Sequence, residues 1–349
     1  MLRIFIIVLL ILAVVIIAIA ARFFFSNTPF NEKAKYLYIH TGHVTENDVM
    51  NTITQENLVK NPRSFDIIAT QMDVWPSLHA GRYEVKKGTS LFELARKLRN
   101  GAQSPVNLVI TKIRTKENLA SIIGKKFETD SAQVMQFLNN SNTLHQYQLD
   151  TNTVMTAVFP NTYTYLWTTP PSGIFKKLFA EYKRVWNEER RKKADSLGLT
   201  PSSVYILASI IEEETNNNNE KGLIASVYMN RMAKNMNLGA DPTVKFALRN
   251  FSLKRIYEKH LAVESPYNTY RVKGLPPGPI CTPSVATLDL VLNAPKTDYL
   301  FFVAKKDFTQ GHVFTSNYQE HLKYAREYQQ ALNTQEQQKQ KTAREEIDE

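Results

Sequence analysis

The stretch that decides the fold of the main domain is Val204-Tyr205-Ile206-Leu207-Ala208-Ser209-Ile210-Ile211-Glu212-Glu213-Glu214-Thr215. It follows Pro201-Ser202-Ser203 and has apolar residues at helical spacing, so we predict a helix here. At about 100° per residue, Glu214 lies three, four and seven positions after Ile211, Ile210 and Leu207. The pattern therefore predicts that Glu214 lies on the centre line of the apolar face.

Three adjacent acids are ordinarily a solvated helix end, which is the alternative interpretation of residues 212–214. Glu212 and Glu213 fall beside the centre line, whereas Glu214 falls on it. Burial disfavours the charged form of a carboxyl group and raises its pKa. A glutamate that keeps its proton near neutral pH is what a general acid for glycosidic cleavage requires, so we predict that Glu214 is catalytic.

A second catalytic carboxylate is not evident. Ordinary glycosidases use two carboxyl groups, and Asp241 is the obvious second candidate. Its position directly before Pro242 is more typical of a helix N-cap. A single glutamate is suited to a mechanism in which the substrate supplies its own nucleophile.

The N-terminus begins with an apolar run. Residues Ile4 to Ala21 include no polar side chain, and eighteen residues meet the lower limit for a helix that crosses a bilayer. We therefore predict a cytoplasmic stub and transmembrane anchor over residues 1–27. A cleaved signal peptide is the alternative. Positive charges lie on both sides of the run, so the positive-inside rule does not decide the orientation.

Charge and residue composition limit the classes of partner and cofactor that this chain could bind. The net charge of +10 suits nucleic acid, anionic lipid or an anionic wall polymer, but the basic residues form no block and no nucleic-acid motif. No nucleic acid partner is therefore expected. The single cysteine, Cys281, excludes an internal disulfide and is interpreted as a small buried loop residue. The histidines show no metal-ligand spacing, so neither a metal nor a cofactor is expected.

Strand, turn and helix patterns divide the rest of the chain. Three extended segments, each followed by a helix that a threonine opens, predict an α/β region over residues 30–130. The predicted capping threonines are Thr45, Thr89 and Thr115. Residues 131–332 are predicted to be mainly helical, with a helix over Ile174–Leu197 that Gly198 ends and a closing hairpin over Tyr299–Ala304 and His312–Thr315. Asp241 and Thr282, each directly before a proline, are predicted helix N-caps. The polar tail, residues 333–349, reads as a frayed or disordered helix. The fold class is thus α+β.

Ordered sequence blocks carry a resemblance to a known family. They begin with Ala208–Thr215 and Val227–Met232, and continue through Asp241-Pro242-Thr243, Tyr267–Tyr270, Gly274–Ile280, Thr282-Pro283, Ala294–Val303 and Gly311–Asn317. In this order they resemble the MltG/YceG-like endolytic murein transglycosylases. The second α/β unit, with its Lys86-Lys87-Gly88-Thr89 turn, resembles a LysM module, which binds glycans that contain N-acetylglucosamine.

The resemblance implies a lytic-transglycosylase-like catalytic domain that cuts peptidoglycan strands without water. Its catalytic glutamate maps to Glu214, which would act as acid and then as base on the β-1,4 bond between N-acetylmuramic acid and N-acetylglucosamine, leaving a 1,6-anhydro end. The implied location is the cell (inner) membrane, with a single anchor and the catalytic domain facing the periplasm or wall. Peptidoglycan synthases are candidate partners.

Supporting roles follow from the same blocks. Asn268 and Tyr270 are candidates to bind the sugar, Thr215 and Thr243 to orient the glutamate, and His312 to close the site. Loop and cap hydrogen bonds are the alternative roles of the first four residues, and a second acid or base role is the alternative for His312. Two other functions stay open: a non-catalytic peptidoglycan-binding scaffold and a hydrolytic muramidase.

Overall fold

The N-terminal helix α1 spans Leu2–Phe24 in the computed structural model, which describes residues 2–24, 27–309 and 311–348. Within these ranges, nothing is described of the side chains of residues 2–3, 16–24, 336 and 339–348. The expected anchor therefore lies partly outside the described side chains. Among those described, the apolar helical stretch Ile4–Val15 is shorter than a membrane span, and no single helix is long and apolar enough to cross a bilayer.

The chain divides into two units that interleave along the sequence. Unit 1 comprises residues 1–108, 121–134 and 162–174, and unit 2 comprises 109–120, 135–161 and 175–349. Between the anchor and the tail, the sequence predicted a boundary near residue 130, which divides the α/β region from the mainly helical region. The strands β3 (Val106–Ile110) and β4 (Asn161–Tyr165), which are far apart in the sequence, form a two-stranded sheet.

Unit 1 is built on an antiparallel pair, β1 (Ala34–Ile39) and β2 (Gly81–Lys86), in which Leu37 lies opposite Tyr83. Alternate residues of both strands are buried, as expected of a sheet with one covered face. The helices of this unit supply the rest of its core, and they are α2 (Glu46–Gln55), α3 (Pro62–Gln71) and α4 (Leu91–Arg99), with the short η1 (Trp75–Ser77).

The helix starts of the α/β region agree with the sequence in two of three cases. Thr45 caps α2, where its hydroxyl accepts from the Asp48 amide, and Thr115 caps α5 (Lys116–Gly124), where it accepts from the Asn118 amide. The prediction of Thr89 for α4 was wrong by one residue. Ser90 is the cap, because its side chain accepts from the Glu93 amide while Thr89 is buried in the turn.

The helix expected over Ile174–Leu197 is two helices. These are α8 (Pro171–Val185) and α9 (Glu188–Ser196). The break has a physical cause, because the Asn187 side chain accepts from the Arg190 amide and so starts a new helix. Gly198, in the left-handed conformation at φ +67°, ends α9 as the sequence predicted.

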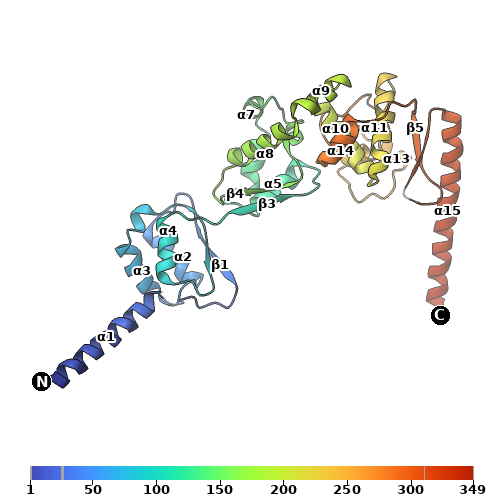
Figure 1. Cartoon of the computed structure of the whole chain (residues 1–349). Coiled ribbons are helices and arrows are strands. Elements are labelled where there is room, and N and C mark those ends of the chain that lie inside the picture. Colours follow the sequence, from blue (N-terminus) through green and yellow to red (C-terminus); the bar gives the residue numbers. More distant parts are fainter. Residues whose placement is uncertain (1, 25–26, 310, 349) are drawn as a thin grey trace. The chain divides into compact units, whose positions relative to one another are not determined.

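The core of unit 2 forms around α10 (Pro201–Glu214). Every residue from Val204 to Ile211 is buried, so this helix is enclosed on all sides and not along one stripe. Its neighbours include α11 (Asn218–Ala233) and α14 (Val285–Leu292) (Figure 1). Helix α12 (Asp241–Ala247) also packs against it. The predicted hairpin is confirmed as β5 (Phe301–Ala304) and β6 (His312–Thr315), which are antiparallel.

The remaining helices are short except for the last. α15 (Tyr318–Asp348) packs against β5, and the polar tail that was expected to be frayed or disordered continues it as helix (Figure 1). The other elements are α6 (Ser131–Leu138), α7 (Ser141–His145), η2 (Val154–Ala157) and α13 (Glu258–Leu261). With three small sheets among many helices in the described ranges, the expected α+β class is confirmed.

Two predicted N-caps were wrong by one or two positions. Ala240 and not Asp241 is the N-cap of α12, so Asp241 is the first helical residue and its carboxylate accepts from Tyr270. Ser284 and not Thr282 caps α14, through a bond from the Thr287 amide. Thr282 instead accepts from the amide of Ile113 at 3.0 Å.

Gly278 allows a close backbone approach. A Cβ added there would lie 2.2 Å from the carbonyl oxygen of Asn152 and 2.8 Å from the Tyr267 hydroxyl. We expect Gly278→Ala to lower the free energy of unfolding by about 1–3 kcal/mol, the usual cost of overpacking. Thermal unfolding measures this, and an unchanged midpoint would contradict the close approach.

Candidate active site

The three glutamates at the end of α10 lie in three different environments. Each is partly buried, so exposure alone does not separate them, and the apolar stripe that the sequence predicted is not what distinguishes Glu214. Because successive side chains on a helix point about 100° apart, Glu212, Glu213 and Glu214 reach three separate sets of partners. Their chemistry is set by those partners.

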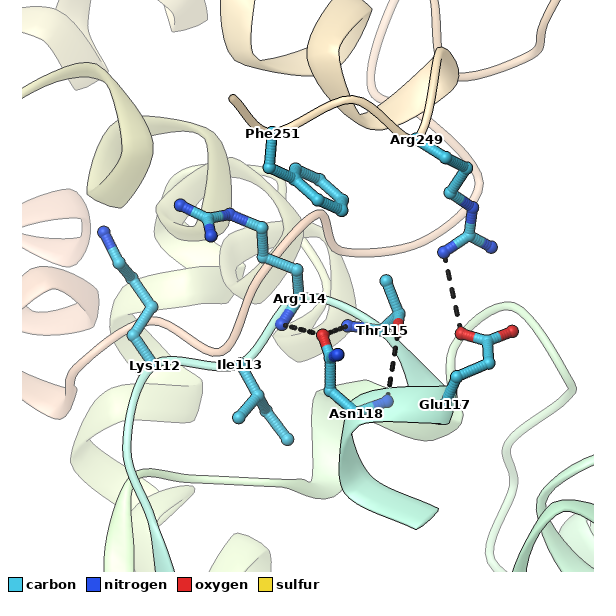
Figure 2. Close-up of a pocket in the computed structure, with 8 residues that line it drawn as sticks. All are labelled: Lys112, Ile113, Arg114, Thr115, Glu117, Asn118, Arg249 and Phe251. Atoms are coloured by element: carbon cyan, nitrogen blue, oxygen red, sulfur yellow. Dashed lines mark hydrogen bonds and ion pairs between the residues drawn. The ribbon is translucent and has the colours of Figure 1, made fainter. Parts of the chain in front are cut away.

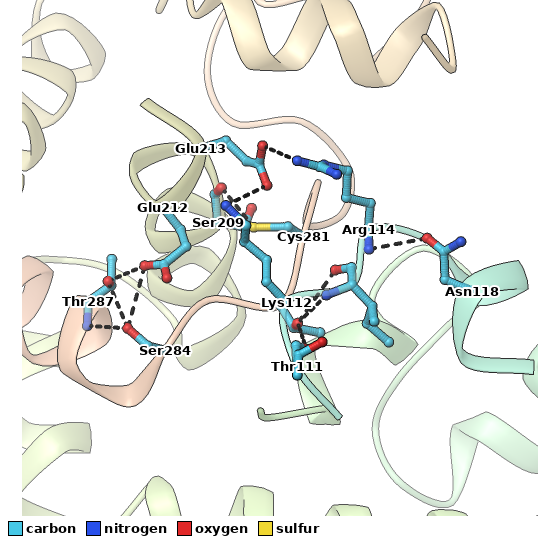
Figure 3. Close-up of polar contacts among 12 residues, drawn as sticks. Thr111, Lys112, Arg114, Asn118, Ser209, Glu212, Glu213, Cys281, Ser284 and Thr287 are labelled. Carbon is cyan, nitrogen blue, oxygen red and sulfur yellow. Dashed lines mark hydrogen bonds and ion pairs between the residues drawn. The ribbon is translucent and has the colours of Figure 1, made fainter. Parts of the chain in front are cut away.

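Glu212 is held in a buried ion pair. The Nζ of Lys221, a residue 4% exposed, lies 2.9 Å from Glu212 Oε2 and 2.9 Å from the Thr287 hydroxyl. Thr287 and Ser284 also donate to Glu212 (Figure 3). Burial works against the charged form, but the bonds from Thr287 and Lys221 outweigh it and hold the pKa of Glu212 below its ordinary value. Glu212 is therefore a fixed carboxylate.

Glu213 faces cations from another segment. The Arg114 guanidinium donates to its Oε2 at 2.8 Å, and the Lys112 ammonium lies 3.3 Å from its Oε1 (Figure 3). Beside these residues, Ser209 accepts from the Ile280 amide, and the Cys281 thiol donates to the Ser209 carbonyl. Cys281 is buried, which confirms its predicted packing role.

Glu214 has a neutral partner. The Tyr228 hydroxyl, on α11, donates to Glu214 Oε1 at 2.6 Å, and Tyr228 itself is 1% exposed. Burial of the carboxyl group raises the pKa of Glu214 to about 7, even though the bond from Tyr228 lowers it, and the charge of Asp241 raises it further. Glu214 thus holds its proton for a substantial part of the time at neutral pH.

The Glu214 side chain reaches solvent through a pocket of about 350 Å³. The pocket lies within unit 2, at the end of α10 and beside the β5–β6 hairpin. Its lining is mostly polar and includes Thr215, Asn216, Asn217, Lys305, Phe308, Gly311, His312 and Tyr328. A buried acid that opens into a polar pocket is an arrangement suited to proton transfer to a bound polar ligand.

Asp241 and Tyr270 form a second polar pair near Glu214. The Tyr270 hydroxyl donates to Asp241 Oδ1 at 2.6 Å, and burial followed by the bond to Asp241 raises the pKa of Tyr270. Arg231 interacts electrostatically with Glu214, Tyr228 and Tyr270. Its guanidinium is anchored by the carbonyl oxygens of Leu300 and Leu238, each 2.6 Å away. The charges that act on the Glu214 carboxyl group are those of Asp241, Lys245 and Arg231.

The two predicted threonines lie in different places. Thr215 is the C-cap of α10 and lines the pocket, and its hydroxyl accepts from the Asn217 amide at 3.0 Å. Thr243 is fully buried, donates to the Ala240 carbonyl and lies 2.8 Å from the Thr269 hydroxyl. Thr243 therefore ties the start of α12 to the loop that carries Tyr270.

Asn268 is fully buried and braces that same loop. Its amide nitrogen donates to the carbonyls of Leu261 and Val263, and its amide oxygen accepts from the Tyr270 backbone. These bonds use both side-chain hydrogens and the oxygen. Asn268 thereby fixes where Tyr270 stands.

His312 lines the pocket with Glu214. Its backbone amide and its Nδ1 each lie 2.8 Å from the carboxylate of Glu220, a 9% exposed residue near the start of α11. The Phe302 ring meets the His312 ring edge-on, with 5.4 Å between centroids. The histidine ring is therefore held in one orientation at the pocket wall.

Tyr228, Glu220 and Lys305 were missed by the sequence reasoning. Tyr228 lies fourteen residues after Glu214 on another helix, so only the packing of α10 against α11 brings the two together. Tyr228 lies in the block Val227–Met232, which carries part of the family resemblance, and a polar aromatic residue inside a buried helix was the available signal. Among the side chains that the structure describes, no group of three His, Cys, Asp or Glu is arranged to hold a metal ion.

Comparison with known proteins matches residues 37–327 to the model of the YceG-like family. A Bacillus subtilis (strain 168) protein named endolytic murein transglycosylase is 28% identical over 306 residues, covering 82% of each chain. A Streptococcus pneumoniae serotype 2 protein of the same name is 26% identical over 303 residues, which span 78% of this chain and 54% of that one.

A solved structure supports the match. The crystal structure of a putative yceG-like protein from Listeria monocytogenes aligns with a TM-score of 0.55 at 26% identity, over 84% of this chain and 99% of that chain. The family match includes α10, the Tyr228 partner and the hairpin that borders the pocket. The chain therefore belongs to the YceG-like family.

Proposed function

We propose that this chain is an endolytic murein transglycosylase that uses Glu214 as its acid and base. The relatives that carry this name support the class of reaction. The observation that carries the residue assignment is the Glu214 carboxyl group, which is bonded to Tyr228, opens into a polar pocket and has its pKa raised to about 7 by burial. Such a group can give a proton and then take one at the same pH.

The proposed reaction cuts the β-1,4 bond between N-acetylmuramic acid and N-acetylglucosamine. Glu214 gives its proton to the glycosidic oxygen as the bond to the muramoyl C1 breaks. The muramoyl C6 hydroxyl attacks C1, and its proton passes to the Glu214 carboxylate, which restores the acid. No water is consumed, and the products are a 1,6-anhydro end and a free 4-hydroxyl.

The surrounding residues are assigned to positioning. Tyr228 holds one oxygen of Glu214, and Asn268 holds the loop that carries Tyr270. The ring of His312, which Glu220 holds, would contact the sugar from the pocket lining. Digestion of purified glycan strands followed by mass spectrometry tests the reaction. Anhydro ends support the proposal, and an absence of products would favour a scaffold.

Tyr228→Phe tests whether Tyr228 sets the pKa of Glu214. The bond from Tyr228 lowers the pKa of Glu214, so its loss should raise that pKa. Because the acid form starts the reaction, kcat/KM should fall as pH rises through about 7, and the variant should move this fall to higher pH. The pH profile of strand cleavage measures it. A fall that moves to lower pH, or stays in place, would contradict the role of Tyr228.

Hydrolysis is the second candidate, because the charge of Asp241 acts on Glu214. Asp241 is exposed and bonded to Tyr270, so it could take a proton from water in a two-carboxylate mechanism. Reducing ends in the products, lost in Asp241→Asn, would favour this reaction. Anhydro ends that persist in Asp241→Asn would favour the transglycosylase.

We also propose that the chain is anchored in the cell (inner) membrane by its N-terminal apolar run, with the residues after that run facing the periplasm or wall. The run from Ile4 to Ala21 supports this placement, as does a murein substrate. Peptidoglycan synthases are proposed partners, and the LysM-like segment of β2 and α4 is proposed to bind glycan. Protease added outside cells with an intact cytoplasmic membrane should cut unit 2. Cleavage only when the protease is on the cytoplasmic side would overturn the proposed orientation.

A further inference from the structure

A second cavity of about 610 Å³ lies in unit 2 and contains none of the residues of the Glu214 pocket. One wall comes from residues 112–118, and the other comes from Arg249 and Phe251 (Figure 2). We call it the basic groove, and it is lined by Lys112, Ile113, Arg114, Thr115, Glu117, Asn118, Arg249 and Phe251. Nothing in the reaction proposed above uses it.

The cations of the groove are arranged for an anion of low charge. Lys112 and Arg114 share Glu213, and Arg249 lies 3.6 Å from Glu117, so three cations face two carboxylates. These five side chains together carry one net positive charge. Arg114 lies over the Phe251 ring at 5.0 Å, which holds its planar guanidinium in place and adds an apolar surface beside it (Figure 2). This combination suits a carboxylate attached to a partly apolar chain.

Arg249 stands in a conformation that an arginine rarely adopts. It follows the C-cap of α12 with φ +52°, where glycine or asparagine is usual. The left-handed conformation costs a residue with a Cβ about 1–2 kcal/mol. A strained backbone position that presents a charged side chain to a cavity is typical of ligand sites.

We propose that the basic groove binds the carboxylate of a peptide stem on the murein strand. The ligand class rests on the proposed function. Arg249 and Arg114 would hold the carboxylate, while Phe251 and Ile113 would contact the peptide side chains. Because Arg114 also holds Glu213, the residue before the proposed acid, the groove and the Glu214 pocket are fixed to the same helix end. The chain would thus bind the peptide stem of the strand as well as its sugars.

The test measures binding without catalysis. The full chain carrying Glu214→Gln is titrated with a synthetic stem tetrapeptide by calorimetry, and then with inorganic phosphate. Arg249→Asn removes the cation and keeps a residue that tolerates the left-handed backbone, so its thermal midpoint should not fall. Its affinity for the peptide should drop about 10- to 100-fold, as for loss of a charge-assisted hydrogen bond. Arg249→Lys should bind with intermediate affinity.

The outcomes separate the groove from the reaction. Peptide binding that is weakened by Arg249→Asn supports the groove even when strand cleavage fails altogether. Unchanged peptide affinity in a folded Arg249→Asn chain overturns the proposal. Phosphate binding tighter than peptide binding overturns the ligand class. In active chain, Arg249→Asn should raise KM for strands that carry stems and leave KM unchanged for strands stripped of their peptides. An equal effect on both kinds of strand also overturns the proposal.

Discussion

Glu214→Gln is expected to lower kcat for strand cleavage by at least about 1,000-fold, since the same group would act twice and general acid–base catalysis contributes about 10²–10⁴-fold. Gln keeps the size of the side chain and an oxygen that can accept from Tyr228, so the pocket should stay intact. The measurement is the yield of anhydro ends from purified strands at saturating substrate. Residual cleavage within tenfold of the parent chain would remove Glu214 from its proposed role.

The same variant should be more stable than the parent above neutral pH. The pKa of Glu214 is about 7 in the folded chain, compared with 4.5 for an ordinary exposed glutamate, the value we take for the unfolded chain. Between pH 4.5 and about 7, the folded chain therefore keeps a proton that the unfolded chain has lost. The free energy of unfolding therefore falls as pH rises from 4.5 to about 7 and then stays level. The penalty is about 3 kcal/mol at most.

Thermal midpoints at pH 4.5 and pH 8 measure this difference. Glu214→Gln should unfold with the parent at the lower pH and at a higher temperature at the upper pH. Glu264→Gln is the matched control, because that carboxylate is 88% exposed and should change neither stability nor cleavage. A variant that loses activity and also unfolds earlier at pH 8 would point to a structural role for Glu214.

Lys221→Met is expected to be the most destabilising single change, with a loss of about 3–5 kcal/mol. It leaves the Glu212 carboxylate without its cation, in a site where the partners Thr287 and Ser284 can only donate hydroxyl hydrogen bonds. Chemical denaturation at neutral pH measures the change. Lys193→Met is the matched control, since its ion pair with Glu189 is exposed and should contribute little.

A double variant identifies the cause. If the unpaired charge of Glu212 is responsible, then Lys221→Met with Glu212→Gln should recover most of the stability that Lys221→Met loses. The interaction free energy from the four chains measures the coupling directly. Losses that simply add in the double variant would show that the methylene packing of Lys221, and not its charge, is what matters.

Local signals in the sequence predicted much of the fold. Thr45 and Thr115 were found as helix caps because a cap hydrogen bond spans only three residues. The β5–β6 hairpin was found because its strands are close in sequence. The break at Asn187 was missed, since the residues around it keep a helical period and only the cap bond to Arg190 stops the helix.

The candidate site was predicted only in part. Glu214 was singled out by its helical position, and its raised pKa agrees with the expected burial, although α10 proves to be buried on every side. The partners Tyr228 and Glu220 could not be predicted, because they depend on how α11 packs against α10 and the hairpin. Contacts between residues that are distant in sequence produce no repeating pattern of residues, so a single sequence does not reveal them.

Three glutamate side chains in the last turn of α10 contact three different kinds of partner. Glu212 contacts a buried ammonium group, Glu213 contacts two partly exposed cations, and Glu214 contacts a phenol hydroxyl. Adding one residue before Glu212 would rotate this turn by about 100° and give each acid the surroundings of the next. Evolution therefore has little freedom to change the length of this helix. Related chains are expected to differ in length after Thr215, where Asn216 and Asn217 line the pocket before α11 begins at Asn218, and not within α10 itself.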